Sequence, residues 1–310
     1  MLNDERRSHP RRLRSGTWLS AVVVLAAWGA FWACPGEAQD PFKIVFIAYE
    51  NPNQLLEDVD PVVEYLERAL GRPVKAFVAT DYAGVVEALR NGSADAAFMG
   101  ALQYLLAHRH GGAEPILGEV YGGSTTYRSR IFVRKDSGLE NLADLEGKTI
   151  AFVDPVSSSG YLYPLVIFKD AGLIEGRDQA DSYFRRSYFA GGDEQALRAV
   201  LNGFVDAAGI GEFAYDLLRG DERDQISWIA ESRPIPSHCV VVRKGLASES
   251  RESFKKALLA LNEGPDRALL QRLYGVDGYV EVDGETYGEV ETLAESEGFL
   301  PSAERVAGGG

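Results

Sequence analysis

Cysteine and histidine are scarce in this chain of 310 residues, which contains two cysteines and four histidines. No pair of these residues has the spacing of a metal site. The cysteines are Cys34 and Cys239, and only Cys239 remains if an N-terminal signal segment is removed, which then excludes an intrachain disulfide. We therefore expect neither a bound metal nor a cofactor.

Positive charge is also in short supply, because 46 acidic residues outnumber 32 basic ones and give a net charge of −14. Five arginines and three acids precede residue 39, so the rest of the chain has 27 basic and 43 acidic residues and a net charge of −16. Such a surface repels nucleic acid, and we expect no nucleic-acid partner. A small anion can still bind where the site is local and built from dipoles.

The chain lacks long apolar runs apart from residues 18–33, which follow a cluster of arginines and precede small residues at positions 36–38. This order is typical of a secretory signal, so we predict a signal peptide at 1–38 and a periplasmic location. Two alternatives remain open. Cys34 could carry a lipid, although Phe31 and Trp32 are bulky for a lipobox, and the run could stay as an anchor, although a span needs about 20 residues.

Strand-like and helix-like segments alternate along the rest of the chain. Residues 43–48, 74–79 and 94–99 read as strands, and 60–70 and 82–90 read as helices. This alternation predicts an α/β fold with mainly parallel strands.

A faint internal repeat relates residues 85–100 to residues 196–211 at a constant offset of 111. Each copy predicts a helix, an Asn-Gly stop and a short buried strand that ends in glycine. An α/β chain can repeat such a unit by chance, but six matched positions favour two related lobes. The matched positions are Ala88/Ala199, Asn91/Asn202, Gly92/Gly203, Asp95/Asp206 and the two Ala-Ala pairs that follow.

Two β-rich segments, 127–134 and 239–243, flank the middle of the chain and are predicted to cross between the lobes. We expect lobe 1 to comprise 41–128 plus 238–310 and lobe 2 to comprise 129–237. The predicted architecture is therefore a two-lobed α/β protein with two crossover strands.

Residues 149–164, TIAFVDPVSSSGYLYP, combine a buried strand, a hydroxyl-rich turn and the start of an apolar helix. Backbone N–H groups in the first turn of a helix attract an anion, and three consecutive hydroxyls add donors for a tetrahedral oxyanion. The alternative is an ordinary serine N-cap with two solvated neighbours. No Gly-x-Ser-x-Gly elbow accompanies these serines, and the histidines have no evident Ser/Asp partnership, so we predict that the chain is not an enzyme.

Together these features resemble the type II periplasmic solute-binding proteins, and more narrowly the phosphonate/phosphite/phosphate-binding components of ABC transporters. The resemblance covers residues 43–274, with its most specific motifs at 81–84 (DYAG), 142–148 (LADLEGK) and 154–164. It implies capture of a small phosphorus oxyanion (phosphite, phosphate or a small alkylphosphonate) between the lobes and its delivery by a monomer to an inner-membrane ABC permease. The alternative is a periplasmic sensor subunit that presents the oxyanion to a histidine kinase.

The resemblance also implies ligand-binding residues. Tyr82 and Tyr127 would reach the ligand from lobe 1 and from the first crossing, and Glu212 would accept a hydrogen bond from a P–OH group or an amine. The family motifs place the serine turn on the oxyanion, through Ser157, Ser158 and Ser159.

One position departs from the aminoalkylphosphonate binders of the family, where an acid that follows the Ile-Pro of the return crossing meets the ammonium group of the ligand. This chain has His238 there, and we predict it as a ligand-binding residue that could donate a hydrogen bond to an oxygen of the ligand or carry a pH dependence. Because an imidazole is a poor partner for an ammonium group, this difference favours a small oxyanion over 2-aminoethylphosphonate.

Overall fold

The computed structural model of this protein describes residues 40–47 and 52–300. The predicted signal peptide (1–38) and Cys34 lie outside the described residues. Within these residues, no helix has both the length and the apolar character that a membrane crossing requires.

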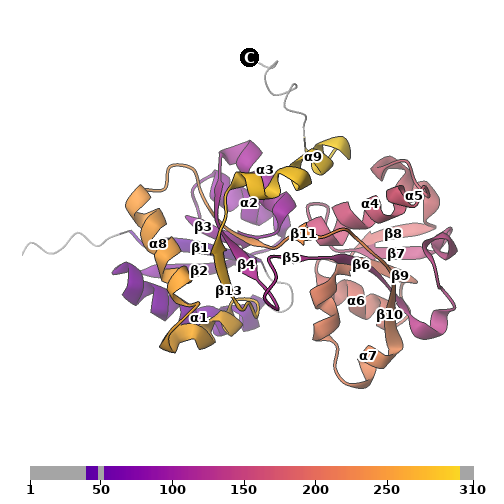
Figure 1. The fold of residues 1–310 in the computed structure, drawn as a ribbon, viewed down its shortest axis with the longest axis horizontal. Helices are drawn as coiled ribbons and strands as arrows, with labels where there is room; N and C mark the ends of the chain where they lie inside the picture. Colours follow the sequence, from indigo (N-terminus) through magenta and orange to yellow (C-terminus); the bar gives the residue numbers. More distant parts are fainter. Residues whose placement is uncertain (1–39, 48–51, 301–310) are drawn as a thin grey trace, which may run out of the picture. The chain divides into compact units, whose positions relative to one another are not determined.

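The first of two large sheets has six strands in the order β13-β4-β12-β3-β1-β2 (Figure 1). Strands β1, β2 and β3 are parallel, and β12 and β13 pair antiparallel to their neighbours. The six strands are β1 (Phe42–Ile47), β2 (Val74–Ala79), β3 (Ala96–Met99), β4 (Glu114–Val120), β12 (Cys239–Val242) and β13 (Gly278–Glu281).

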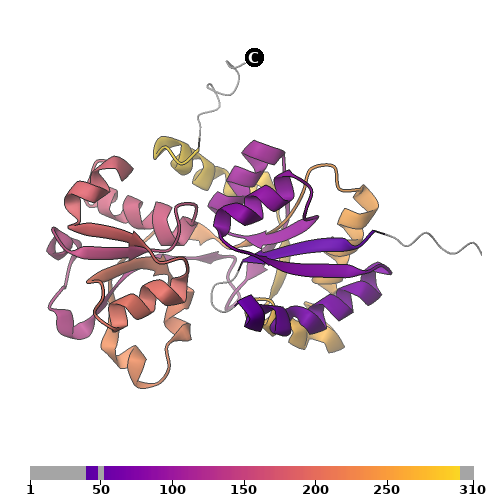
Figure 2. The same ribbon diagram turned by 180° about the vertical axis from the view of Figure 1, so that it is seen from behind.

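Helices cover both faces of this first sheet, as the view from behind also shows (Figure 2). Helices α1 and α8 pack together, and α2 packs with α3, which also contacts α9. Their bounds are α1 (Pro52–Leu70), α2 (Tyr82–Arg90), α3 (Ala101–Gly111), α8 (Ser248–Ala260) and α9 (Gly288–Ser296). The side chains buried beneath α1 and α8 form one apolar cluster with the sheet.

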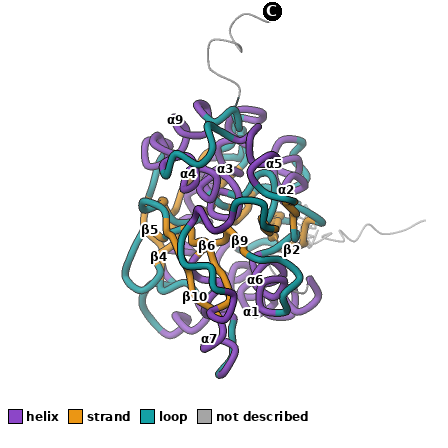
Figure 3. The backbone as a smooth tube through the Cα atoms, turned by 90° about the vertical axis from the view of Figure 1, so that its right-hand side faces the viewer, coloured by secondary structure: helices purple, strands orange, loops and turns teal. Residues whose placement is uncertain are grey.

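The second sheet has five strands in the order β10-β6-β9-β7-β8, with β7, β8 and β9 parallel. Figure 3 shows β6, β9 and β10 of this sheet, with α4 above them and α7 below them in that view. Figure 1 shows α4 and α5 above this sheet and α6 and α7 below it. The strands are β6 (Ser129–Arg134), β7 (Thr149–Phe152), β8 (Arg186–Phe189), β9 (Ala207–Gly211) and β10 (Ile226–Glu231). The helices are α4 (Tyr163–Asp170), α5 (Ala180–Tyr183), α6 (Asp193–Leu201) and α7 (Asp221–Gln225).

Short helical turns complete the described residues. Most have 3₁₀ geometry and one, η3, is a π-helical turn. They are η1 (Lys135–Ser137), η2 (Leu142–Leu145), η3 (Ser158–Leu162), η4 (Arg177–Gln179), η5 (Glu212–Leu217), η6 (Pro265–Arg272) and η7 (Gly284–Tyr287).

Two crossing segments connect the sheets, and they pair with each other as β5 (Thr126–Tyr127) and β11 (Ile235–Pro236). All strands of the first sheet fall within 42–120 and 239–281, and all strands of the second fall within 129–231. The prediction of an α/β architecture is confirmed by these two sheets. We continue to propose the lobe bounds predicted above, because both crossings fall where those bounds change lobe.

The two copies of the internal repeat adopt the same local structure in the two sheets. Helix α2 and strand β3 belong to the first copy, and α6 and β9 occupy the same offset in the second. Gly92 and Gly203 both have positive φ, at 76° and 71°, which a glycine tolerates without strain. In each copy the matched aspartate accepts a hydrogen bond from the strand that pairs parallel with the strand of the repeat: Lys43 N–H of β1 to Asp95 at 2.9 Å, and Thr149 N–H of β7 to Asp206 at 2.8 Å.

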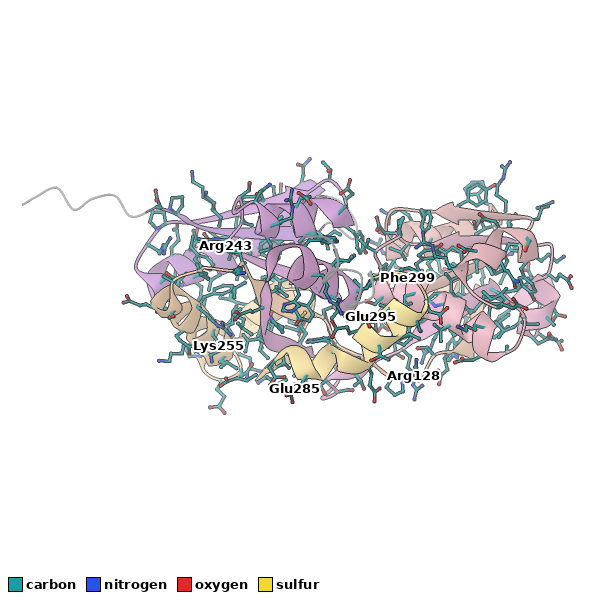
Figure 4. All side chains as sticks on the ribbon, turned by 90° about the horizontal axis from the view of Figure 1, so that it is seen from above. Arg128, Arg243, Lys255, Glu285, Glu295 and Phe299 are labelled. Carbon is teal, nitrogen blue, oxygen red and sulfur yellow. The ribbon has the colours of Figure 1, made fainter. Side chains whose placement is uncertain are left out.

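The C-terminal part of the described chain contacts both sets of helices, and Figure 4 shows α9 with Glu295 and Phe299 at its far end. Arg109 of α3 pairs with Glu291 at 2.6 Å and also with Glu295. Beyond α9, the ring of Phe299 lies 5.3 Å from that of Tyr161 in η3. The tail was predicted to consist of helices that close lobe 1, and its last described residues also reach η3 beside the second sheet.

Candidate functional site

A cavity of about 710 Å³ lies between the two sheets. Its wall is built largely from residues that follow the C-terminal ends of strands in both sheets, which is where open α/β folds bind ligands. Six of the seven residues predicted as ligand-binding contribute to this wall: Tyr82, Tyr127, Ser157, Ser158, Ser159 and His238. The seventh, Glu212, does not.

The three serines form a buried turn between β7 and α4, and each is less than 7% exposed. Ser157 caps the turn by accepting from the Gly160 N–H at 3.0 Å. Ser158 Oγ accepts from the N–H of Leu102, in the first turn of α3, at 2.8 Å. A hydroxyl that accepts one bond can still donate its own proton, so these side chains can present O–H groups to an anion.

Gly160 makes this turn possible through close packing. A Cβ atom at this position would lie 2.3 Å from Val153 Cγ2 and 2.8 Å from Ser157 Oγ. The turn therefore folds against the end of β7 only because position 160 has no side chain.

Two buried tyrosines face the cavity as neutral donors. Burial raises the pKa of Tyr82, and the nearby carboxylates of Asp193 and Asp154 raise it further. Burial also raises the pKa of Tyr127, although a hydrogen bond with Ser159 partly lowers it. Both phenols therefore stay protonated near neutral pH and can donate to an oxyanion.

His238 lies in the wall beside Tyr127, whose hydroxyl is 3.4 Å from His238 Nε2. Its other ring nitrogen, Nδ1, is 3.6 Å from Oε2 of Glu119, a fully buried residue of β4. Tyr121 donates to the same Glu119 oxygen at 2.8 Å, and Glu119 Oε1 has no hydrogen-bond partner within the described residues. Tyr127 and Glu119 thus flank the two ring nitrogens of His238.

Glu212 is turned away from the cavity and holds the first crossing segment. Its Oε1 accepts from the Arg128 N–H at 2.9 Å, and its Oε2 pairs with Arg130 Nη2 at 2.9 Å. Both oxygens are therefore already engaged by the chain itself. A direct contact between Glu212 and the ligand stays a prediction from the resemblance.

Three acids line the cavity, Asp58, Asp216 and Asp193, and the sequence analysis singled out none of them. Asp193 is the first residue of α6. Its Oδ1 accepts from the Gly211 N–H at 3.2 Å. Burial raises the pKa of Asp193, while the Gly211 hydrogen bond and the nearby His238 lower it in part. The repeat offset of 111 contained a signal for this residue, because it carries Tyr82 onto Asp193.

Gly100 and Gly211, the final glycines of the two repeats, were predicted only as strand ends and also line the cavity. A Cβ atom on Gly100 would lie 3.5 Å from both His238 Cδ2 and Ser158 Oγ. A Cβ atom on Gly211 would lie 3.1 Å from Ser159 Oγ. Both strands thus bring bare backbone against the serine turn.

The remainder of the wall is mixed: it contains aromatic and aliphatic side chains and also the charged residues Asp58, Asp216 and Arg272. The rings of Tyr121 and Phe213 lie 4.4 Å apart, and Phe213 stacks on Tyr127 at 5.2 Å. Tyr274 and Leu217 line the same part of the cavity. Polar donors at one end and aromatic rings at the other suit a ligand that has a charged head and room for a small substituent.

Comparison with known proteins identifies the family of this chain. The family described as "ABC transporter, phosphonate, periplasmic substrate-binding protein" matches residues 44–287. The chain belongs to this family. Members of the family are transport proteins, so the prediction that the chain is not an enzyme is confirmed.

Two curated relatives have similar sequences. The phosphate-import protein PhnD of Mycolicibacterium smegmatis is 37% identical over 184 residues, which are 58% of this chain and 56% of that protein. The match thus spans little more than half of the mycobacterial protein. The phosphonates-binding periplasmic protein of Escherichia coli is 30% identical over 251 residues, 77% of this chain and 72% of that protein.

Solved structures show the same fold. A binding-protein component of an ABC phosphonate transporter from Pseudomonas aeruginosa superposes with a TM-score of 0.75 at 23% identity, covering 84% of this chain and 87% of that one. PhnD1 from Prochlorococcus marinus, in complex with methylphosphonate, gives a TM-score of 0.74 at 17% identity, covering 84% and 98%. These likenesses confirm the predicted type II periplasmic binding-protein fold.

Proposed function

We propose that this protein captures a small phosphorus oxyanion, namely phosphite, phosphate or a small alkylphosphonate, between its two lobes and delivers it to an ABC permease of the inner membrane. The observation that carries the proposal is the convergence of the buried serine turn, Tyr82 and Tyr127 on one cavity. These groups supply hydrogen-bond donors without a formal positive charge, as a local anion site on an acidic protein requires. The curated relatives are named for phosphate import and phosphonate binding, which supports the same ligand class.

Ligand contacts on both sides of the cavity would couple binding to closure of the lobes. Tyr82 follows strand β2 of the first sheet, and the serine turn follows strand β7 of the second. A ligand held by both groups binds the closed form better than the open form, and this differential affinity shifts the population towards closure. The closed form is the state that a permease would recognise, so we propose the permease as the partner and retain the predicted monomer.

Calorimetric titration tests this function. Purified protein, stripped of carried-over ligand by unfolding and refolding, is titrated with phosphate, phosphite, methylphosphonate, 2-aminoethylphosphonate and sulfate. We expect tight binding of at least one phosphorus oxyanion, with affinity reduced about tenfold or more in Ser159→Ala and Tyr82→Phe, because each removes a hydrogen bond to a charged group. Ser93→Ala, at an exposed turn, serves as the matched control. No binding across the panel would remove the proposal.

A further inference from the structure

Of the three carboxylates that line the cavity, Asp58 pairs with Arg272 and Asp216 with Arg223, and the third is Asp193. Asp193 lines the same wall as the serine turn, Tyr82 and Tyr127. A site that consists only of donors would accept any small tetrahedral anion of the right size. An ionised carboxylate changes this, because it accepts hydrogen bonds and cannot donate them.

The carboxylate lies at the serine end of the cavity. A Cβ atom placed on Gly211 would lie 3.1 Å from Ser159 Oγ, 3.5 Å from Tyr127 Cε2 and 3.6 Å from Asp193 Oδ1. These three side chains therefore surround one point at the end of β9. Asp193 is thus positioned beside the donors that would hold the oxyanion itself.

The backbone fixes the orientation of the Asp193 side chain. Oδ1 accepts from the Gly211 N–H at 3.2 Å, and Asp193 begins α6, where the helix dipole favours a negative charge. The carboxylate also interacts with the backbone N–H of Asp193 itself. With Oδ1 held by the Gly211 N–H, Oδ2 would be the oxygen that meets a ligand. An asparagine at this position would keep the Gly211 bond through its carbonyl oxygen and present an NH₂ group in place of Oδ2.

We propose, on the basis of the proposed function, that Asp193 selects ligands that carry at least one protonated oxygen. A P–OH group can donate to Oδ2 while its unprotonated oxygens accept from the serines and tyrosines. Sulfate and phosphinates have no such proton when ionised, so their lone pairs would face the carboxylate. Such repulsion between like charges in a buried site would exclude these proton-free anions.

Several titratable groups surround Asp193, and they bear on its charge. On its own helix Glu194 pairs with Arg198 at 2.6 Å, and beyond β9 Glu212 pairs with Arg130. His238 interacts with Asp193, and Asp154, Tyr127 and Tyr274 interact with Tyr82. Since burial raises the pKa of Asp193, acidification converts it to a neutral donor before an exposed aspartate would change. Rejection of proton-free anions should therefore weaken as the pH falls.

Titrations with two pairs of anions test the proposal. Methylphosphonate is compared with dimethylphosphinate, in which a second methyl group replaces one of the two hydroxyl groups of the parent acid. Phosphate is compared with sulfate. The wild-type protein should bind methylphosphonate or phosphate and reject dimethylphosphinate and sulfate. In Asp193→Asn we expect the affinity for the proton-bearing ligand to fall about tenfold to a hundredfold, and sulfate or dimethylphosphinate binding to become measurable.

The matched control is Glu194→Gln, the same change of charge at the next residue of α6, which does not line the cavity. It should keep the wild-type selectivity. If wild-type protein binds phosphate and Asp193→Asn retains full selectivity against sulfate, the role of Asp193 is overturned while the proposed function stands. Strong preference for 2-aminoethylphosphonate that Asp193→Asn alone abolishes would overturn it too, because the carboxylate would then serve an ammonium group. Failure of every phosphorus oxyanion to bind the wild-type protein would instead reject the proposed function.

Discussion

The two copies of the internal repeat share their framework and differ in what they present to the cavity. Each has a helix, an Asn-Gly turn, an aspartate that accepts a hydrogen bond from the neighbouring parallel strand, and a strand followed by or ending in a cavity-lining glycine. At the first position of the helix, however, the first copy has Tyr82 and the second has Asp193. The framework is repeated, whereas at this one position the first copy offers a hydrogen-bond donor and the second copy an acceptor.

The copies also differ after the final glycine. Beyond Gly100 the chain continues as the regular helix α3, whose Leu102 N–H bonds Ser158. Beyond Gly211 it forms the short 3₁₀ turn η5, and the side chain of Glu212 bonds Arg128 and Arg130. One copy thus extends towards the serine turn, and the other anchors the crossing segment. The strand pairing is therefore the same in both copies, whereas the segments that follow the final glycine differ.

The largest effect should follow removal of either repeated aspartate. Asp95→Ala leaves the Lys43 N–H without its acceptor, and Asp206→Ala does the same to the Thr149 N–H and hydroxyl. Each variant should lower the free energy of unfolding by about 2–3 kcal/mol, the cost of an unsatisfied buried group together with its lost bonds. Urea unfolding measures both. Asp136→Ala, whose carboxylate is 82% exposed, is the control, with an expected loss below about 0.5 kcal/mol. A large loss in one copy and none in the other would contradict a shared framework.

The two final glycines should respond unequally to substitution. A methyl group on Gly211 would crowd Ser159 Oγ at 3.1 Å, whereas one on Gly100 would make ordinary contacts of 3.5 Å. We expect Gly211→Ala to weaken oxyanion binding about tenfold and Gly100→Ala to weaken it less than about threefold, since affinity depends on the exact placement of donors. Titration calorimetry gives both values, and melting temperatures check that the variants fold. Equal losses would mean that the two glycines play the same part.

Asp193 and Asp206 should affect stability with opposite pH trends. Burial raises the pKa of Asp193 in the folded protein, so the unfolded chain releases this proton first and stability falls as the pH rises from the unfolded pKa of about 3.9 through the folded value. For Asp206 burial acts in the same direction, but hydrogen bonds from Thr149 outweigh it and leave its pKa lowered. Its stabilisation is present above the unfolded pKa and is lost as the pH falls through the folded one.

Melting temperatures of ligand-free protein between about pH 3 and pH 8 test these signs. Near neutral pH, Asp193→Asn should melt above the wild type and Asp206→Asn below it. Both differences should shrink as the solution is acidified past the respective pKa values. If the ionised Asp193 carboxylate stabilised the folded protein at neutral pH, that result would contradict a raised pKa of this group in the folded state.

Much of the fold could be predicted because its signals are local. The apolar strand at Thr149–Phe152, the serine turn and the Asn-Gly stops each follow from neighbouring residues. Strands β4, β10 and β13 were not predicted, because they pair antiparallel with partners far away in the sequence. The site shows the same limit. Glu119 and His238 are far apart in the sequence and come together only in the folded chain. Asp193 has the pattern of an ordinary acid at a helix start, and only extension of the repeat back to Tyr82 would have singled it out.

Glu212 shows why a strand-end position is not enough to assign a ligand contact. Antiparallel pairing of β6 with β9 places Ser129 opposite Gly211 and thereby brings the neighbouring Arg128 and Arg130 to the carboxylate of the next residue. That register cannot be read from the motif around residue 212. The side chain is consequently drawn to the crossing segment, while its strand still ends at the cavity.

The smallest change in affinity should therefore come from Glu212→Gln. The amide keeps an acceptor for the Arg128 N–H and loses the charge that pairs with Arg130, whose guanidinium also lies 4.2 Å from the Trp228 ring. We expect oxyanion affinity to change less than about threefold and the free energy of unfolding to fall by about 1 kcal/mol, as for a partly exposed ion pair. Titration and urea unfolding of the same preparation measure the two effects. A loss of affinity as large as that of Asp193→Asn would show that Glu212 contacts the ligand after closure, and that the second copy offers two acceptors to the cavity.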